Sequence, residues 1–280
     1  MKKLMVALTA MTAFTGTAVA ADLAARPVKA LPPPVPVVSW TGCYISGGGG
    51  YGMMKVDHSE TANILGIGAV NTPITGNRTT GGDGWLATVG AGCDYQFNSR
   101  WVVGGFADGT WSDLHGDHGT TIFSFDDTNV QGRMKQDWSW AVGGRVGYLV
   151  NPSFLTYVNA GFTQAHLQAT NLNFIAFDGG LFSGVQLPGQ TLDGYFIGSG
   201  IEYQMDWLPG LFVRSEARGN VYNRKSVSPT CVAVTGFCGA LGVNGLGFSQ
   251  LEDRRLITYT GKVELVYRFN WSGAPLVAKY

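Results

Sequence analysis

The sequence predicts an all-β fold, an eight-stranded antiparallel transmembrane β-barrel with short periplasmic turns and four long extracellular loops. Three observations support this prediction: a glycine-rich and charge-poor composition, a four-residue ending that recurs along the chain, and segments in which polar and apolar residues alternate. Charged residues make up 14 % of the chain, whereas soluble domains usually carry about 25 %. The chain therefore has too few charges to cover a water-facing exterior of its size.

The composition also excludes two other classes of protein. Hydrophobic residues make up 45 % and aromatic residues 12 % of the chain, whereas intrinsically disordered chains are poor in both. The formal net charge is +0 and there is no basic run, so the electrostatic footprint of a nucleic-acid-binding protein is missing. We expect an ordered protein with no nucleic-acid partner.

The N-terminal residues predict export from the cytoplasm. Lys2 and Lys3 form a basic start, an apolar stretch follows, and small residues end at Ala20, so we expect cleavage between Ala20 and Ala21. The apolar stretch is short for a membrane span and is interrupted by threonines. Clustered prolines then favour an extended linker. We expect a cleaved signal peptide at 1–20, a Pro-rich periplasmic linker at 21–39, the barrel at 40–270 and a C-terminal tail at 271–280.

A four-residue ending, which reads tyrosine, any residue, apolar residue, then Asn or Asp, recurs along the chain. It occurs at 95–98, 148–151, 203–206 and 267–270. Each of the first three copies runs into a turn rich in Asn, Asp, Pro or Gly and then into a new apolar segment. The strands expected from these turns are 42–53, 84–97, 100–112, 136–150, 153–167, 192–206, 211–224 and 255–269. The long loops expected between them are 54–83, 113–135, 168–191 and 225–254, a pattern typical of outer-membrane barrels.

Alternation in the expected strands separates a polar face from an apolar face. In the last strand Tyr259, Val263 and Leu265 alternate with Lys262 and Glu264. Alternation alone would also suit a soluble barrel with its apolar face inside. Aromatic residues at both ends of the apolar faces and the shortage of charge favour an apolar exterior, as in a membrane barrel.

An eight-stranded barrel is just wide enough inside for side chains to fill it, so we expect a plugged, ion-paired lumen. The alternative is that some of the charges line the two rims. The expected lumen charges are Arg145, Glu202, Arg214, Glu216, Arg218, Lys262, Glu264 and Arg268.

The four cysteines form an even number in a chain that is exported to an oxidising compartment. Cys43 and Cys93 are expected near the same edge of adjacent strands, where they could form a disulfide or remain as two reduced, lipid-facing thiols. Cys231 and Cys238 share the fourth long loop and could close a small ring.

The remaining motifs carry little chemistry. The glycine run at 47–52 has the spelling of a dinucleotide-binding fingerprint, but no helix-forming segment follows it. His115 and His118 are weak candidates for a metal site, because imidazole is a common ligand but histidines on a glycine-rich loop are usually solvated. We expect no catalytic residues and no cofactor.

Several segments resemble a known family. They are Ala21–Pro27, the proline tract, Trp40–Ile45, Gly92–Phe97 and Gly261–Phe269. Together these segments resemble the small outer-membrane β-barrel proteins of alphaproteobacteria, the porin-like surface antigens of rhizobia and their relatives in the OmpA-like eight-strand class. The resemblance covers nearly the whole chain outside the long loops.

The resemblance implies an abundant, non-enzymatic barrel of the outer membrane with a structural and surface-antigen role. Alternatives are a small-solute porin, and a surface receptor, adhesin or haem-compound binder that uses the long loops. Implied partners are outer-membrane lipid, lipopolysaccharide, the barrel-assembly machinery and a host or environmental surface ligand. Tyr267 and Phe269 look like the terminal assembly signal, although 11 residues follow and Tyr280 is the alternative end.

Overall fold

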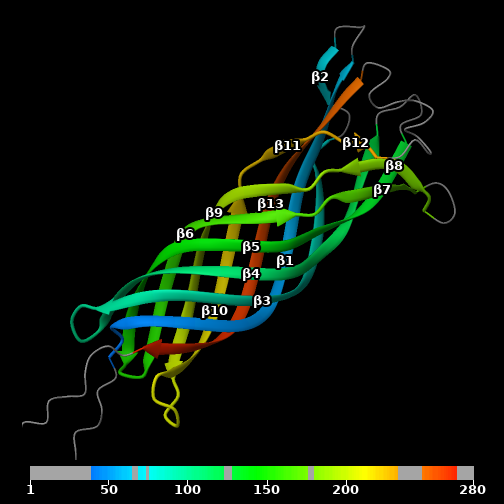
Figure 1. Ribbon diagram of the computed structural model, residues 1–280. Helices are drawn as coiled ribbons and strands as arrows, with labels where there is room; N and C mark the ends of the chain where they lie inside the picture. Colours follow the sequence, from blue (N-terminus) through cyan, green and yellow to red (C-terminus); the bar gives the residue numbers. More distant parts are fainter. Residues whose placement is uncertain are drawn as a thin grey trace, which may run out of the picture. The chain divides into compact units, whose positions relative to one another are not determined.

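The computed structural model describes residues 39–64, 69–73, 76–122, 128–175, 180–232 and 248–269 (Figure 1). The expected signal peptide, its cleavage site at Ala20 and Ala21, residues 21–38 of the expected linker and the tail at 271–280 lie outside these residues. In the described part of the chain, no helix is long and apolar enough to cross a membrane.

Eight long antiparallel strands form a closed ring. They are β1 (Gly42–Ile64), β3 (Arg78–Gln96), β4 (Trp101–Ile122), β5 (Thr128–Asn151), β6 (Phe154–Leu167), β9 (Gln190–Gln204), β10 (Leu211–Tyr222) and β13 (Phe248–Phe269). Each strand pairs with the next in this order, and β1 pairs with β13 from Cys43↔Phe269 to Ile64↔Phe248. Closure pairs the backbone groups of both edge strands, so the ring has no open edge.

Short turns join the strands at one end of the barrel, which we call the turn end. Between β3 and β4, Asn98 adopts a φ of 92°, and its side-chain oxygen accepts hydrogen bonds from the amides of Arg100 and Trp101 at 3.1 and 3.2 Å. Between β9 and β10, Gly210 adopts a φ of 87°. Asparagine and glycine tolerate this left-handed conformation, which explains the turn residues of the recurring four-residue ending.

The strands run further than the sequence predicts at the opposite end, which we call the far end. β1, β4 and β13 continue through much of the expected loops 54–83, 113–135 and 225–254. The outward positions become polar there, for example at Lys55 and Asp57, while inward positions such as Met54 and Val56 stay buried. The strands predicted from the sequence end where the outward apolar residues end, but the hydrogen-bonded ladder and the apolar inner face continue.

Five short strands lie at the far end. They are β2 (Ala69–Pro73), β7 (Thr170–Phe174), β8 (Phe182–Leu187), β11 (Lys225–Val227) and β12 (Thr230–Cys231). β7, β8 and β12 pair in that order and extend the sheet from β5, whereas β11 pairs with β13 and β2 with β1 (Figure 1). We call the β7–β8–β12 extension the lid.

Three apolar clusters occupy the interior. The lower apolar layer, toward the turn end, contains Trp40, Tyr44, Val102, Leu149, Leu155, Tyr157, Phe212 and Val266. The upper apolar layer contains Met54, Val56, Leu114, Met134, Ala165, Leu167, Leu192, Tyr222 and Leu256. The lid core contains Val130, Leu172, Val185, Leu187 and Val227.

Candidate functional site

The eight charged residues expected in the lumen all lie on inward positions, and none is more than 7 % exposed. They come from β5, β9, β10 and β13, where the two-residue period of a strand turns alternate side chains inward. Asp94 on β3 and Asp108 on β4 join them. Among the described residues, these ten side chains form two ion clusters in the lumen, which Glu264 joins because it lies 3.6 Å from Arg214 and 3.8 Å from Lys262.

The lower ion cluster is built around two carboxylates and three arginines. Glu202 accepts hydrogen bonds from Arg145 Nη1 at 3.1 Å, Arg214 Nε at 3.1 Å and Arg268 Nη2 at 2.7 Å. Asp94 pairs with Arg145, whose Nε lies 2.9 Å from Asp94 Oδ1, and with Arg268, whose Nη1 lies 2.7 Å from Oδ2. Glu202 therefore connects its own strand, β9, to three others.

Tyr44 packs among the three arginines of the lower ion cluster. Its ring centroid lies 4.8 Å from the guanidinium of Arg145, 4.7 Å from that of Arg214 and 5.0 Å from that of Arg268. A cation over an aromatic face is attracted by the ring quadrupole, and this attraction is stronger where water is excluded. Tyr44 thus fills the space between the arginines and adds to their stabilisation.

The upper ion cluster contains two cations and three carboxylates. Arg218 binds both oxygens of Asp108, at 3.1 and 2.8 Å, and lies 2.7 Å from Glu216. Lys262 Nζ lies 3.4 Å from Glu216, 3.8 Å from Asp108 and 3.8 Å from Glu264. The cations of the two clusters, Arg145, Arg214, Arg218, Arg268 and Lys262, equal in number the carboxylates, Asp94, Asp108, Glu202, Glu216 and Glu264. The charges of the two ion clusters together therefore balance.

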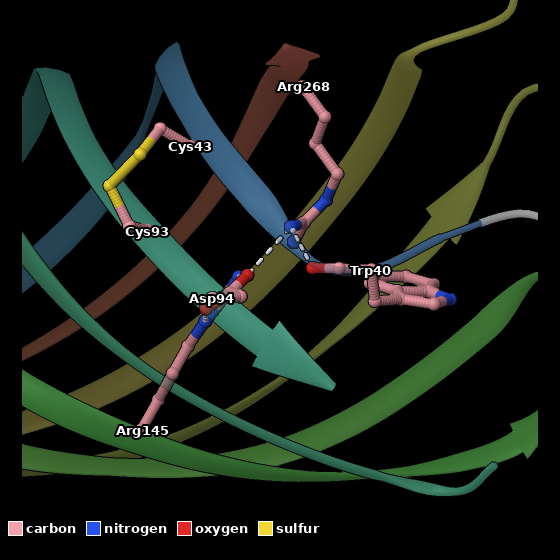
Figure 2. Close-up of a disulfide and its surroundings, with 6 residues drawn as sticks. All are labelled: Trp40, Cys43, Cys93, Asp94, Arg145 and Arg268. Atoms are coloured by element: carbon pink, nitrogen blue, oxygen red, sulfur yellow. Dashed lines mark hydrogen bonds and ion pairs between the residues drawn. A yellow bond between two sulfur atoms is a disulfide. The ribbon is translucent and has the colours of Figure 1, made fainter. Parts of the chain in front are cut away.

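Trp40 closes the turn end of the lumen (Figure 2). The residue is fully buried, its indole Nε1 donates to the carbonyl of Pro152 at 3.0 Å, and its own carbonyl accepts from Arg268 Nη1 at 3.2 Å. Its ring lies 4.9 Å from that of Phe212. The residue before the first strand thus turns into the barrel and caps the lower ion cluster.

Little space is left between these side chains. One lumen cavity, lined by Tyr44, Asp108 and Arg145 among others, measures about 10 Å³, and a second, lined by Leu114 and Arg218 among others, about 20 Å³. A water molecule needs at least about 10–15 Å³ on this measure, so each cavity suits about one water.

Cys43 and Cys93 form a disulfide between β1 and β3. They are direct partners in the register of the two strands, both are exposed on the outer surface, and Asp94 follows on the inward side (Figure 2). Cys231 is also disulfide-bonded, and Cys238 lies outside the described residues.

His115 and His118, the weak metal candidates, lie on opposite faces of β4. His115 points outward, with Nδ1 3.8 Å from the exposed Asp113. His118 points inward, is fully buried, and has Nε2 3.1 Å from Glu252 Oε1. The two imidazoles therefore do not share a site, and no group of three or more described His, Cys, Asp or Glu side chains could hold a metal ion.

The outer surface carries a belt of exposed apolar side chains. On β3 and β9, Trp85 is 72 % and Ile197 69 % exposed, and Tyr267 and Phe269 lie at the belt's turn end. Further belt residues are Ile45, Tyr51, Met53, Val89, Tyr95, Trp101, Val103, Trp111, Trp140, Val142, Val146, Val158, Phe162, Tyr195, Ile201, Tyr203, Tyr259, Val263 and Leu265. A closed barrel with an apolar exterior and a charged interior has the polarity of a protein dissolved in lipid. The chain is an outer-membrane β-barrel.

Comparison with known proteins gives structural neighbours only. No family model and no curated protein matches the sequence. The outer membrane protein OprG from Pseudomonas aeruginosa aligns over 82 % of this chain and 97 % of its own, with 14 % identity and a TM-score of 0.45. The outer membrane protease OmpT from Escherichia coli covers 81 % and 97 %, with 9 % identity and a TM-score of 0.46. Neisserial surface protein A covers 78 % and 97 %, with 13 % identity and a TM-score of 0.33.

Three residues of the ion clusters and their cap were not predicted from the sequence. Asp94 alternates with the outward Cys93 and Tyr95, so the two-residue period could have placed it inside. Asp108 stands between Ala107 and Gly109, whose small side chains define no apolar face. Trp40 precedes the first strand, where no alternation applies, and only its large apolar ring beside a proline-rich segment hinted at burial.

Proposed function

We propose that the barrel is a non-enzymatic structural protein of the outer membrane with a lumen closed by side chains, which presents its far end as a surface antigen. This is the role implied by the resemblance to the porin-like small barrels of alphaproteobacteria. Outer-membrane lipid and lipopolysaccharide would surround the belt, and the barrel-assembly machinery would read Tyr267 and Phe269 at the end of β13. The far end, where the strands extend beyond the belt, would face the cell's surroundings and any ligand there.

The observation that carries the proposal is the charge-balanced pair of ion clusters. Glu202 and Glu216 each bind cations from more than one strand, and the adjoining cavities suit single waters. Separating one buried pair costs about 3–5 kcal/mol, because it leaves an uncompensated charge away from water. A small-solute porin would require several such separations along the lumen, so this alternative is the less favoured one.

Single-channel recording in planar bilayers tests the proposal directly. We expect no stable conductance from the purified monomer, and no swelling of liposomes loaded with small sugars. The double variant Glu216→Ser/Arg218→Ser removes two partners of the upper ion cluster together and serves as the positive control for an opened lumen. A large, stable conductance from the unmodified monomer would refute the closed lumen and favour the porin alternative.

A further inference from the structure

A second set of buried ionisable side chains lies in the far end, outside the belt. His58 on β1, His118 on β4, and Glu252 and Arg254 on β13 point inward, and none is more than 3 % exposed. The outward neighbours at this level are polar, as at Asp57 and Arg255, so these groups sit beyond the membrane-spanning segments. They belong to neither of the two ion clusters, and we call them the histidine cluster.

The two imidazoles of the histidine cluster are in contact. Their ring centroids lie 4.4 Å apart, and His58 Nε2 lies 3.3 Å from the carbonyl of Gly119. Glu252 Oε1 is 3.1 Å from His118 Nε2 and accepts a hydrogen bond from Arg254 Nε at 2.7 Å. His58 Nδ1 and both Nη atoms of Arg254 are buried without a hydrogen-bond partner. The cluster therefore already contains buried polar groups without partners.

No ion pair of the described residues includes His58. Glu252 pairs with His118 and Arg254, and the fully buried Glu60 accepts a hydrogen bond from Gln250, so a proton added to His58 brings a charge that no described ion pair balances. Of the other packed strands, β3 brings the exposed Arg78 opposite His58, and β11 brings the exposed Lys225 opposite Arg254. Both are cations, and β5 brings the apolar Val130 and Met134.

The histidine cluster adjoins the lid core. Strand register places Val227 of the lid core opposite Glu252, and Val130 opposite Thr120, two residues beyond His118. The lid itself is joined to the barrel by a short ladder, in which Val130 pairs with Phe174 and Gln131 with Asn173. Apolar burial therefore holds the lid, and any charge that draws water into the adjoining cluster weakens it.

We propose that the His58–His118 pair is an acid-operated release for the lid, so that protonation of His58 against the facing His118 opens the β7–β8–β12 extension. At neutral pH His58 is neutral and the lid is closed. In acid a proton on His58 brings an uncompensated charge into the buried cluster, water enters, and the apolar contacts of the lid core break.

The strength of the effect follows from proton linkage. Burial lowers the pKa of His58 below its ordinary value of 6.5, and the facing His118 lowers it further, against the opposite effect of Glu252. The closed state therefore holds a neutral His58, while an open, hydrated His58 takes up its proton near pH 6.5. For one such proton the ratio of open to closed lid rises about tenfold between pH 7.5 and pH 5.5.

Hydrogen–deuterium exchange of the intact barrel in detergent micelles tests the release. Protection of the backbone amides of β7 and β8, corrected for the intrinsic effect of pH on exchange, should fall about tenfold from pH 7.5 to pH 5.5. The double variant His58→Gln/His118→Gln should lose this fall. His115→Gln, an exposed histidine on the outer face of the same strand, should retain it.

Two results would overturn the proposal. One is a wild-type lid whose protection is the same at both pH values, and the other is a double variant that keeps the tenfold fall. Heat-modifiable migration on gels shows whether each variant is folded before exchange is measured. If the double variant does not fold, His118→Gln alone must reduce the fall, because it removes the imidazole that faces His58.

Discussion

At the scale of single residues, Glu202 is the charge on which the closed lumen depends most. It faces Arg145, Arg214 and Arg268, so Glu202→Gln leaves three buried cations with Asp94 as their main counter-ion. We expect the variant to lose about 3–5 kcal/mol of unfolding free energy. Urea unfolding in detergent, followed by tryptophan fluorescence, measures the loss.

An exposed ion pair supplies the matched control for Glu202→Gln. Asp113 lies 2.7 Å from Lys135 Nζ, but both side chains are more than a third exposed. Asp113→Asn should therefore change stability by at most about 1 kcal/mol. Equal losses in the two variants would show that burial adds nothing to the lumen pairs.

A second residue-scale prediction concerns acid and Glu252, which lies beyond the membrane-spanning segments. Burial alone would raise its pKa, but the hydrogen bond with His118 and the charge of Arg254 outweigh burial and lower the pKa from 4.5 to about 2. A lowered carboxyl pKa stabilises the fold above pH 4.5, and this stability disappears as the pH falls from 4.5 toward 2.

The matching measurement is amide exchange in the upper part of β13, around residues 250–254, between pH 5 and pH 2.5. Protection should fall in this window in the wild type. Glu252→Gln should be less protected at pH 5 and show a flatter dependence. A variant with the wild-type pH profile would mean that Glu252 does not titrate there.

The residues that face the interior could be predicted from the sequence wherever the two faces of a strand differ in polarity. Arg214, Glu216 and Arg218 alternate with small or apolar neighbours, and their inward positions follow from that alternation. The partners of each charge could not be predicted, because pairing depends on register and on how strands far apart in the sequence meet across the lumen. Asp108 and Trp40 show this limit most clearly.

At the scale of elements, the glycines of β1 determine how closely this strand approaches β13. A Cβ at Gly50 would lie 2.0 Å from the carbonyl oxygen of Gly261 and 2.7 Å from Lys262 Cα. At Gly47 the nearest atom, the carbonyl oxygen of Thr88, is 3.9 Å away. The glycine run at 47–52, which matches a dinucleotide-binding motif in sequence, therefore allows close contact between strands.

This difference predicts opposite outcomes for two chemically equal substitutions. Gly50→Ala should destabilise the barrel by about 1–3 kcal/mol or prevent closure, because the backbone of β13 must move. Gly47→Ala should fold as the wild type does. The folded fraction on unboiled gels and the urea midpoint measure both, and equal behaviour would contradict the close approach.

The disulfide between β1 and β3 acts on the same part of the barrel. It joins residues separated by 50 positions, and closing such a loop restricts the unfolded chain. We expect Cys43→Ser/Cys93→Ser to fold into a closed barrel that is about 2–4 kcal/mol less stable. If the urea midpoint of the double variant matched that of the wild type, the bond would contribute nothing to stability.

Element boundaries could be predicted only within the belt. There the outward apolar and inward polar residues give a clear two-residue period, and the expected strands lie within the observed ones or differ by one or two residues at their ends. Beyond the belt, the outward residues are polar and the inward residues are both polar and apolar. The far-end parts of β1, β4 and β13 were therefore predicted as loops. The lid strands are short and are fixed by pairing rather than by local sequence.

At the scale of the whole molecule, the decisive property is that polarity is reversed relative to a soluble barrel. The sequence predicted the reversal, because 14 % charge is too little for a water-facing surface and aromatic residues stand at both ends of the apolar faces. The structure adds how the interior is filled, with apolar layers on either side of the ion clusters. Only the folded chain brings these layers together.

The reversal predicts how the barrel responds to a charge placed on its exterior. Val263 is 56 % exposed in the middle of the belt, between Tyr259 and Phe269 on the same face of β13. In a bilayer an arginine there must leave water, at a cost of about 2–4 kcal/mol near the midplane. Gln131→Arg, on the outer face of β5 beyond the belt, keeps its charge in water and should cost little. The unfolding free energies of both variants in phospholipid vesicles test this prediction. A soluble barrel would tolerate the two substitutions equally. An outer-membrane barrel is destabilised only by Val263→Arg.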